Sequence, residues 1–182
     1  MPYIPPPELA SLSLSEIAHQ VAQRKLPPVE SWAPEHSGDS RMRICADGTW
    51  LHDNSPITRP AMVRAFASLL TRGQDGVYWL VTPYQKLSIA VEDAAFIAVD
   101  VAQRDDGLAF LLNTDELVIA GPDHPLMARG SADTPALYLH ARRGCEARLN
   151  RSTYQQLAQI ALAAGDDWSV PSQGAVFSLL PA

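Results

Sequence analysis

The order of apolar and polar residues along the chain predicts a protein made mostly of short strands. Residues 43–59 (RICADGTWLHDNSPITR) and residues 110–126 (FLLNTDELVIAGPDHPL) each read as an apolar strand, a tight polar turn and a second apolar strand. In both segments a small or polar residue, a proline and an aliphatic residue come next. Unless it is a coincidence, this similarity predicts two related halves built around β-hairpins, with a groove between them.

Further strands are expected where apolar runs lie between turn signals. They span residues 77–82, 87–91, 96–101, 108–112, 117–120 and 137–141. The apolar tail, residues 170–180, adds another strand or covers a sheet edge. Asp47-Gly48 and Asp105-Asp106-Gly107 are typical hairpin turns. Because short turns join most of these strands, we expect antiparallel sheet to dominate.

Three segments have the spacing of amphipathic helices. The first begins at a capping box, residues 13–16, and runs to about Lys25. The second lies between Pro60 and Gly73, and the third spans about residues 152–164. The apolar face of the second helix consists of Met62, Val63, Phe66, Leu69 and Leu70.

These elements predict an α+β fold of mostly antiparallel β-sheet, with repeated β-hairpin motifs and about three helices. We divide the chain into an N-terminal helix and lead-in at residues 1–26, a first α+β subdomain at 27–84 and a second at 85–182. The boundary follows Thr82-Pro83, where a predicted strand ends.

The composition limits the partners of the protein. The chain has 182 residues, 47% of them apolar, and a formal net charge of −6. A negative charge repels phosphate backbones and anionic lipid surfaces, so neither nucleic acid nor a membrane is an expected partner. The N-terminus lacks the basic and apolar regions of a signal peptide. We therefore expect a cytoplasmic protein in which Cys45 and Cys145 are reduced, with a disulfide between them as the alternative.

Several longer segments resemble one bacterial family. They are GDSRMRICADGTW at 38–50, SPITRPAMVRAF at 55–66, LVTPYQKLSIAVEDAAF at 80–96, HPL at 124–126 and RRGCEARLNRSTY at 142–154. Together these segments resemble the family called domain of unknown function 1285, from about Pro27 to the tail. The resemblance implies a two-domain α+β fold with repeated β-hairpins, and it implies involvement in signal transduction or ligand binding.

The chain departs from the pattern of that family at four positions. Arg41 stands where the family tends to have an acidic residue, and Gln85 stands where it has glutamate. Ala95 replaces a proline, and Cys145 replaces an apolar residue. Carboxylate chemistry that depended on position 41 or 85 is therefore not expected here.

Arginine is the most noticeable candidate for binding, because the guanidinium group matches carboxylates and phosphates in shape and charge. The candidates are Arg59 and Arg64 near the second predicted helix, and Arg142, Arg143, Arg148 and Arg151 in ARRGCEARLNR. Ordinary salt bridges with acidic neighbours are the alternative. Lys86, which follows a strand and Pro83, is a further candidate for contact with an anion.

The predicted binding set also includes aromatic residues. Trp50 follows the Asp47-Gly48 turn, and with Tyr84 it is expected to form the apolar wall of a pocket. The full predicted ligand-binding set is Trp50, Arg59, Arg64, Tyr84, His124, Arg142 and Arg148. The five histidines have no metal-ligand spacing, and CxxC, GxGxxG and P-loop motifs are absent, so we expect no metal and no cofactor.

These features favour a non-enzymatic module with a regulatory role, which binds an acidic small molecule or an acidic protein segment. One alternative is a hydrolase for an acidic substrate, with His124 as the base and Asp47 or Asp115 as the orienting carboxylate. That enzyme needs His124 within hydrogen-bond reach of a carboxylate or hydroxyl group. A third possibility is a pure protein-interaction domain, which would expose an apolar patch or a sheet edge.

Overall fold

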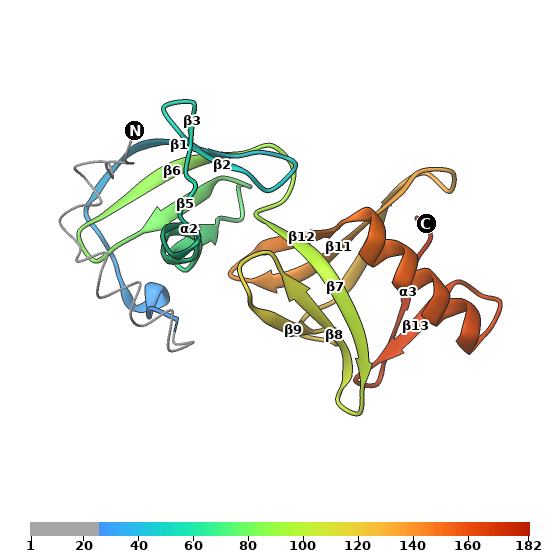
Figure 1. Cartoon of the computed structure of the whole chain (residues 1–182). Coiled ribbons are helices and arrows are strands. Elements are labelled where there is room, and N and C mark those ends of the chain that lie inside the picture. Colours follow the sequence, from blue (N-terminus) through green and yellow to red (C-terminus); the bar gives the residue numbers. More distant parts are fainter. Residues whose placement is uncertain (1–25) are drawn as a thin grey trace. The chain divides into compact units, whose positions relative to one another are not determined.

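The computed structural model describes residues 26–182. The chain divides into two compact units between Asp93 and Ala94 (Figure 1). The first described element is a short 3₁₀ helix, η1 (Val29–Ser31). The helix predicted from residue 13 to about Lys25 lies outside the described residues.

Within residues 26–93, the first unit contains one six-stranded sheet and one α-helix. Its strands are β1 (His36–Ile44), β2 (Trp50–His52), β3 (Ser55–Pro56), β4 (Leu70–Arg72), β5 (Tyr78–Val81) and β6 (Gln85–Val91), and the helix is α2 (Pro60–Ala67). The strands lie in the order β3-β2-β1-β6-β5-β4, in which only β1 and β6 are parallel neighbours. Because β6 completes this sheet, the first unit extends to Asp93 and does not end near residue 84.

The hairpin predicted around Asp47-Gly48 is present. Arg43 pairs with Leu51, and Ile44 pairs with Trp50. The turn needs glycine, because Gly48 has a φ of 91°. The Thr49 amide donates a hydrogen bond of 2.9 Å to Asp47 Oδ1, which lowers the pKa of the Asp47 carboxyl below its ordinary value.

The second predicted helix ends earlier than Gly73. Helix α2 stops at Ala67, where the Ser68 hydroxyl donates a hydrogen bond of 2.6 Å to the carbonyl of Ala65. Leu70 then begins β4 by pairing with Leu80. The residues predicted to form one apolar helix face therefore belong to two elements. Phe66 lies in helix α2, whereas Leu70 lies in strand β4.

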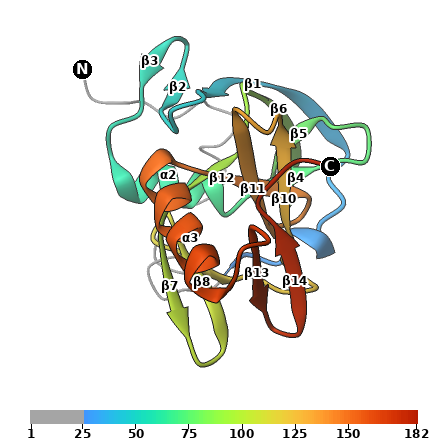
Figure 2. The ribbon, with the colours of Figure 1, turned by 90° about the vertical axis from the view of Figure 1, so that its right-hand side faces the viewer.

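The second unit contains a six-stranded sheet, a helix and a separate hairpin. Its elements are β7 (Phe96–Arg104), β8 (Gly107–Leu112), β9 (Leu117–Ile119), β10 (Leu126–Gly130), β11 (Pro135–Arg142), β12 (Cys145–Leu149), α3 (Arg151–Ala164), β13 (Ser169–Ser172) and β14 (Ala175–Ser178). The large sheet has the order β10-β11-β12-β7-β8-β9, with β12 and β7 parallel. The hairpin of β13 and β14 lies beside α3 (Figure 2).

The expected fold class is confirmed in its main feature and corrected in its helix count. Residues 26–182 form three sheets, mostly antiparallel, with two α-helices where about three were expected. Strands β4, β10 and β12 were not expected from the sequence. In the described part of the chain, no helix is both long enough and apolar enough to cross a membrane.

The two six-stranded sheets share one connectivity. In each, the first three strands form an antiparallel meander, the last three form another, and the first and sixth strands are parallel neighbours at the centre. On this basis β1 corresponds to β7 and β6 corresponds to β12. The two similar sequence segments do not supply corresponding strands. Residues 43–59 supply the end of β1, with β2 and β3, whereas residues 110–126 supply the end of β8, with β9 and the first residue of β10.

The second sheet curls around its inner face. Strands β9 and β10 form opposite edges, which in a flat six-stranded sheet would lie about 24 Å apart. Only residues 120–125 join them, and Gly121 pairs with His124 within that short connection. Curling brings the edges together and encloses buried side chains such as Phe96, Phe110 and Leu149.

Each sheet therefore has an inner face and an outer face. Trp50 of the first inner face stacks on Phe66 of α2, with ring centroids 6.4 Å apart. We call the opposite side of each sheet, which carries Trp79 in the first unit and Tyr138 in the second, the outer face. Cross-strand partners share a face, so Thr71, Trp79 and Ser88 lie together on the outer face of the first sheet.

Candidate functional site

The structure divides the seven residues predicted to bind ligand between the two units. Trp50, Arg59, Arg64 and Tyr84 belong to the first unit, and His124, Arg142 and Arg148 belong to the second. A groove shared by all seven residues stays a prediction.

Trp50 is a core residue and not the wall of an open pocket. Its side chain is 1% exposed, because its position opposite Ile44 directs it to the inner face. Its stacking on Phe66, with an angle of 18° between the ring planes, joins the sheet to α2. Trp50 therefore stabilises the fold of the first unit.

The other three predicted residues of the first unit lie closer to the surface. Arg59 is exposed immediately before α2, and Arg64 is half-buried in the last turn of that helix. Tyr84 is 62% exposed in the turn between β5 and β6, where its amide donates a hydrogen bond to Thr82 Oγ1.

Arg142 is held inside the second unit. One of its guanidinium nitrogens lies 2.7 Å from Glu116 Oε1, and its Cζ atom lies 4.8 Å from the centre of the Phe96 ring. Only 11% of the Arg142 side chain is exposed, and burial lowers the pKa of this guanidinium. Arg142 is therefore an internal ion-pair partner, which corrects its predicted role as a charge offered to ligand.

Among residues 26–182, His124 is bonded to no carboxylate or hydroxyl group, which the hydrolase alternative requires. Its Nδ1 atom lies 3.0 Å from the main-chain carbonyl of His140, and the two imidazole rings stack with centroids 6.1 Å apart. A carbonyl oxygen only accepts, so His124 Nδ1 carries the hydrogen. Asp47, one of the two proposed orienting carboxylates, accepts from Thr49 in the other unit.

The best candidate site lies on the outer face of the first sheet. A cavity of about 550 Å³ is lined by Thr71, Arg72, Gly73, Gln74, Asp75, Trp79, Val81 and Lys86. Strands β4, β5 and β6 supply its floor, and the β4–β5 turn supplies its rim. Lys86 pairs with Val81, and its Nζ atom lies 4.5 Å from the centre of the Trp79 ring. This cation–π contact holds the ammonium group over the indole.

The charge of Lys86 is not neutralised by the protein around it. Within residues 26–182, no carboxylate lies in ion-pair distance of its ammonium group. Asp75, which also lines the cavity, uses Oδ1 to accept a hydrogen bond from the Val77 amide. Arg72 directs its guanidinium to Tyr78, with Cζ 5.2 Å from the ring centre. The Trp79–Lys86 cavity thus offers a fixed cation beside an apolar floor.

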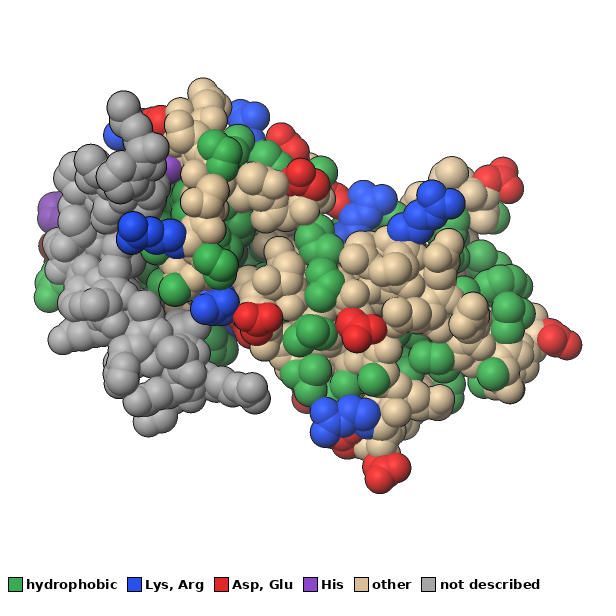
Figure 3. Space-filling view, in the orientation of Figure 1, with side chains coloured by type: hydrophobic (Ala, Val, Ile, Leu, Met, Phe, Trp, Pro, Cys, Tyr) green, Lys and Arg blue, Asp and Glu red, His purple; other side chains and the backbone are tan. Residues whose placement is uncertain are grey.

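A neighbouring cavity of about 480 Å³ shows the opposite arrangement of charge. It is lined in part by Arg41 and Arg43, and each of these residues faces a carboxylate: Arg41 lies 3.5 Å from Asp53, and Arg43 lies 3.8 Å from Glu92. Acidic and basic side chains also mix over the surface seen in Figure 3 and do not gather by sign. Lys86 is therefore distinguished by its surroundings and not by a general basic patch.

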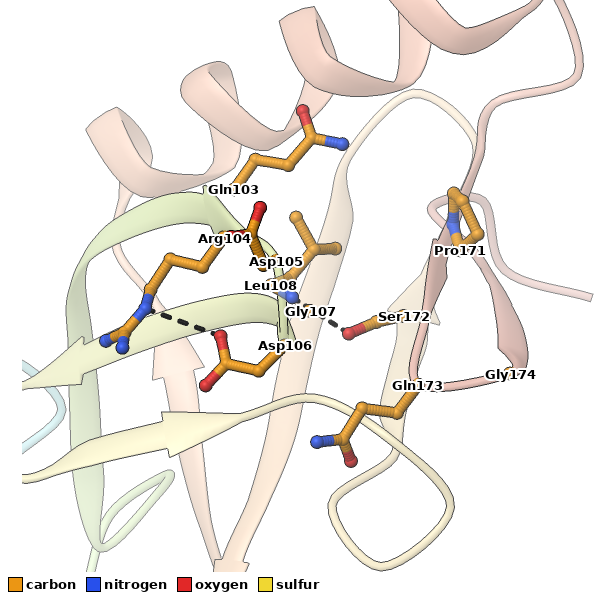
Figure 4. Close-up of a pocket in the computed structure, with 10 residues that line it drawn as sticks. All are labelled: Gln103, Arg104, Asp105, Asp106, Gly107, Leu108, Pro171, Ser172, Gln173 and Gly174. Carbon is orange, nitrogen blue, oxygen red and sulfur yellow. Dashed lines mark hydrogen bonds and ion pairs between the residues drawn. The ribbon is translucent and has the colours of Figure 1, made fainter.

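A third cavity, of about 230 Å³, lies between two turns of the second unit (Figure 4). The Ser172 hydroxyl accepts from the Leu108 amide at 2.9 Å and donates to the Ala120 carbonyl at 2.6 Å. Arg104 pairs with Asp106 at 3.4 Å on the rim. Both hydrogen bonds of Ser172 are used within the protein, so this cavity joins the β13–β14 hairpin to the sheet.

The burial of the two cysteines predicts how readily a thiol reagent labels each of them. Both thiols are free; Cys145 is fully buried, and Cys45 is partly exposed. Burial and the nearby Glu92 and Asp47 carboxylates raise the pKa of the Cys45 thiol. We expect iodoacetamide to label Cys45 slowly at neutral pH and faster as the pH rises, and to reach Cys145 only after unfolding. Mass spectrometry of the native protein tests this, and rapid native labelling of Cys145 would contradict its burial.

Sequence reasoning identified Lys86 but missed Trp79. Trp79 was not among the residues that the sequence predicted to bind a ligand. The alternation of Tyr78, Trp79 and Leu80 along β5 places Trp79 on the outer face. Among residues 26–182, no cluster of three or more histidine, cysteine, aspartate or glutamate side chains is arranged to hold a metal ion.

Comparisons with known families cover both units. The model for "Domain of unknown function (DUF1285), N-terminal domain" matches residues 27–94, and the model for "Protein of unknown function (DUF1285), C-terminal domain" matches residues 95–179. The two matched ranges meet beside the boundary between the units. No curated protein matches the chain.

Two solved structures are similar to this chain. A DUF1285 family protein from Silicibacter pomeroyi DSS-3 is 36% identical, with a TM-score of 0.79 and coverage of 93% of this chain and 96% of the other. A DUF1285 family protein from Shewanella baltica OS155 is 25% identical, with a TM-score of 0.53 and coverage of 65% of this chain and 90% of the other. The family models and the first of these structures show that the chain belongs to the DUF1285 family.

Proposed function

We propose that the protein is a non-enzymatic binding module with a regulatory role, and that its ligand is an acidic molecule bound in the Trp79–Lys86 cavity. The ligand carries a carboxylate or phosphate group that contacts the Lys86 ammonium. Its apolar part packs on Trp79 and Val81.

One observation supports this proposal most strongly: Lys86 is positioned over an indole ring and has no carboxylate beside it within the described residues. The ring limits the movement of the ammonium group, so less side-chain freedom is lost when an anion binds. Lysine offers three N–H donors and no acceptor, which favours an anionic group over a neutral one.

A binding role agrees better with the geometry than hydrolysis does. The hydrogen bond of His124 goes to a main-chain carbonyl, so this imidazole is not oriented by a carboxylate as a catalytic base would be. Among the described residues that line the Trp79–Lys86 cavity, Asp75 supplies the one carboxylate, and that group accepts from the backbone of its own turn. These groups suit recognition of a charge and not proton transfer.

Replacing Lys86 with glutamine should weaken anion binding at least tenfold. A hydrogen bond to a charged group contributes about 1.5–3 kcal/mol, which corresponds to roughly a tenfold to hundredfold change in affinity. Thermal shift with a panel of carboxylates, phosphates and acidic peptides would identify a stabilising anion, because a ligand of the folded state raises the melting temperature. Isothermal titration would then compare the two proteins.

Arg43→Gln is the matched control for that experiment. It also removes one exposed positive charge from the first sheet, but Arg43 faces Glu92 and lines the neighbouring cavity. We expect its affinity for the same anion to stay within about twofold of the unmodified protein. Equal losses in both variants would show a general charge effect and contradict the proposal. So would a panel in which no anion stabilises the protein at concentrations up to about 10 mM.

A further inference from the structure

Two cavities of the first unit lie side by side on the outer face of its sheet. The Trp79–Lys86 cavity has a volume of about 550 Å³, and the neighbouring cavity, which Asp39 and Ser88 help to line, has a volume of about 480 Å³. Cross-strand register joins them, because Trp79 pairs with Ser88 and Ser88 pairs with Asp39. These three side chains therefore form a row across β5, β6 and β1 that leads from one cavity to the other.

The neighbouring cavity has one carboxylate that no basic side chain neutralises. Asp39 is exposed, and its Oδ1 atom accepts a hydrogen bond of 2.8 Å from the Arg41 amide. The Arg41 guanidinium faces Asp53 instead, at 3.5 Å. Within residues 26–182, no basic group lies in ion-pair distance of the Asp39 carboxylate. Asp39 is thus an acidic counterpart of Lys86 on the adjacent strand.

The Lys86 and Asp39 charges do not pair with each other, but one small molecule can reach both. Lys86 lies two residues before Ser88 on β6, and Ser88 pairs with Asp39 on β1. Strand geometry therefore places the Cα atoms of Lys86 and Asp39 about 8 Å apart on one face of the sheet. A charge-assisted hydrogen bond of about 2.8 Å at each end leaves roughly 3 Å between the two charges of a bridging ligand. An α-amino acid has this spacing, because its ammonium and carboxylate groups are attached to the same carbon.

Ser88 and Trp79 complete a site for such a molecule. The Ser88 side chain is half-buried between the two charges, and its hydroxyl has no hydrogen-bond partner among the described residues. A hydroxyl can donate to a carboxylate and accept from an ammonium group. The side chain of the amino acid would then occupy the Trp79–Lys86 cavity, where Trp79 and Val81 supply apolar contacts.

We propose that the ligand of the Trp79–Lys86 cavity is an α-amino acid with a large apolar side chain, bound through its carboxylate to Lys86 and through its ammonium group to Asp39. This inference rests on the proposed function, because it uses the same Lys86 contact, and it adds Asp39 as the residue that determines specificity. An acid without an ammonium group would bind Lys86 but leave Asp39 without a partner. The structure therefore favours the amino acid over the simple acid.

The test is isothermal titration of the full-length protein with L-phenylalanine and with 3-phenylpropionate, which has the same ring and carboxylate but no amino group. We expect L-phenylalanine to bind at least tenfold more tightly, because a hydrogen bond to a charged group changes affinity by roughly tenfold to a hundredfold. Asp39→Asn should abolish this difference by weakening the binding of L-phenylalanine alone. The asparagine keeps the oxygen that accepts from the Arg41 amide, so the backbone of β1 should not change. Lys86→Gln should weaken the binding of both compounds.

Asp53→Asn is the matched control. It removes another carboxylate of the neighbouring cavity, but Asp53 faces Arg41, so we expect both affinities to stay within about twofold of those of the unmodified protein. The amino-acid inference would be overturned if the unmodified protein bound both compounds equally well. It would also be overturned if the preference for L-phenylalanine survived Asp39→Asn, or if Asp53→Asn reduced it equally.

This inference and the proposed function fail in different ways. If both compounds bind equally tightly and both depend on Lys86, the proposed function stands and the amino-acid inference is wrong. The same conclusion follows if neither compound binds but a phosphate of the anion panel binds and depends on Lys86. If L-phenylalanine binds and Lys86→Gln does not weaken it, both proposals are contradicted.

Discussion

Replacing Trp50 with alanine should lower the free energy of unfolding by about 3–5 kcal/mol, which is the usual range when a large aromatic side chain is removed from a core. Trp50 is 1% exposed and stacks on Phe66, so its removal leaves a cavity between β2 and α2. Urea denaturation followed by circular dichroism would measure the change. Trp50→Phe, which keeps an aromatic ring, should cost much less.

The same variant decides between the two roles considered for Trp50. A core residue affects stability first, and anion binding only through the folded fraction. If Trp50→Ala lost less than about 1 kcal/mol of stability yet weakened anion binding, the residue would be a pocket wall, as the sequence suggested. Titration at low temperature, where the variant is still folded, makes the two outcomes distinguishable.

The second large effect is expected for Glu116→Ala. This change removes the carboxylate that lies 2.7 Å from the Arg142 guanidinium and leaves a positive charge in a site where 11% of the side chain is exposed. Breaking a buried ion pair from one side destabilises a protein by about 3–5 kcal/mol. Because the Glu116 side chain is itself 30% exposed, we expect a loss at the lower end of that range, about 3 kcal/mol. Chemical denaturation of the two proteins would measure the loss.

Glu146→Ala is the matched control for this second prediction. Glu146 also pairs with an arginine at 2.7 Å, but 42% of the Arg129 side chain is exposed. We expect a loss of about 1 kcal/mol or less, because water can solvate Arg129 after the change. Equal losses of stability in Glu116→Ala and Glu146→Ala would show that burial does not determine how much each ion pair contributes to stability. Replacing Arg142 with methionine and Glu116 with leucine together should recover much of the stability lost in Glu116→Ala.

The hairpins of the fold could be predicted because their signals are local. Asp47-Gly48 and Asp105-Asp106-Gly107 mark turns, and the flanking apolar residues mark strands of the expected type. Strand β12 was missed because its charged residues read as part of an arginine cluster. Its burial in fact alternates residue by residue, with Cys145, Ala147 and Leu149 inside. The alternation is the stronger signal, since it reports which side chains face the core.

The role of each candidate residue was harder to predict, because it depends on partners that are distant in sequence. Arg142 and Arg148 are close along the chain, yet one is an internal ion-pair partner and the other is on an outer face. Trp50 and Trp79 both lie in apolar strands, but pairing with Ile44 places the first inside, whereas pairing with Ser88 and Thr71 places the second outside. The sequence alone does not show which residues pair across neighbouring strands.

The parallel pairing of first and sixth strands has a consequence for how each unit folds. In the first unit, His36 of β1 pairs with Gln85 of β6, so the centre of the sheet is made by segments that lie far apart in the sequence. Long-range pairing slows folding, because the intervening chain must be closed into a loop before the contact forms. During synthesis, the hairpin of β1 and β2 can form early, but the centre of the sheet cannot close until Val91 has left the ribosome.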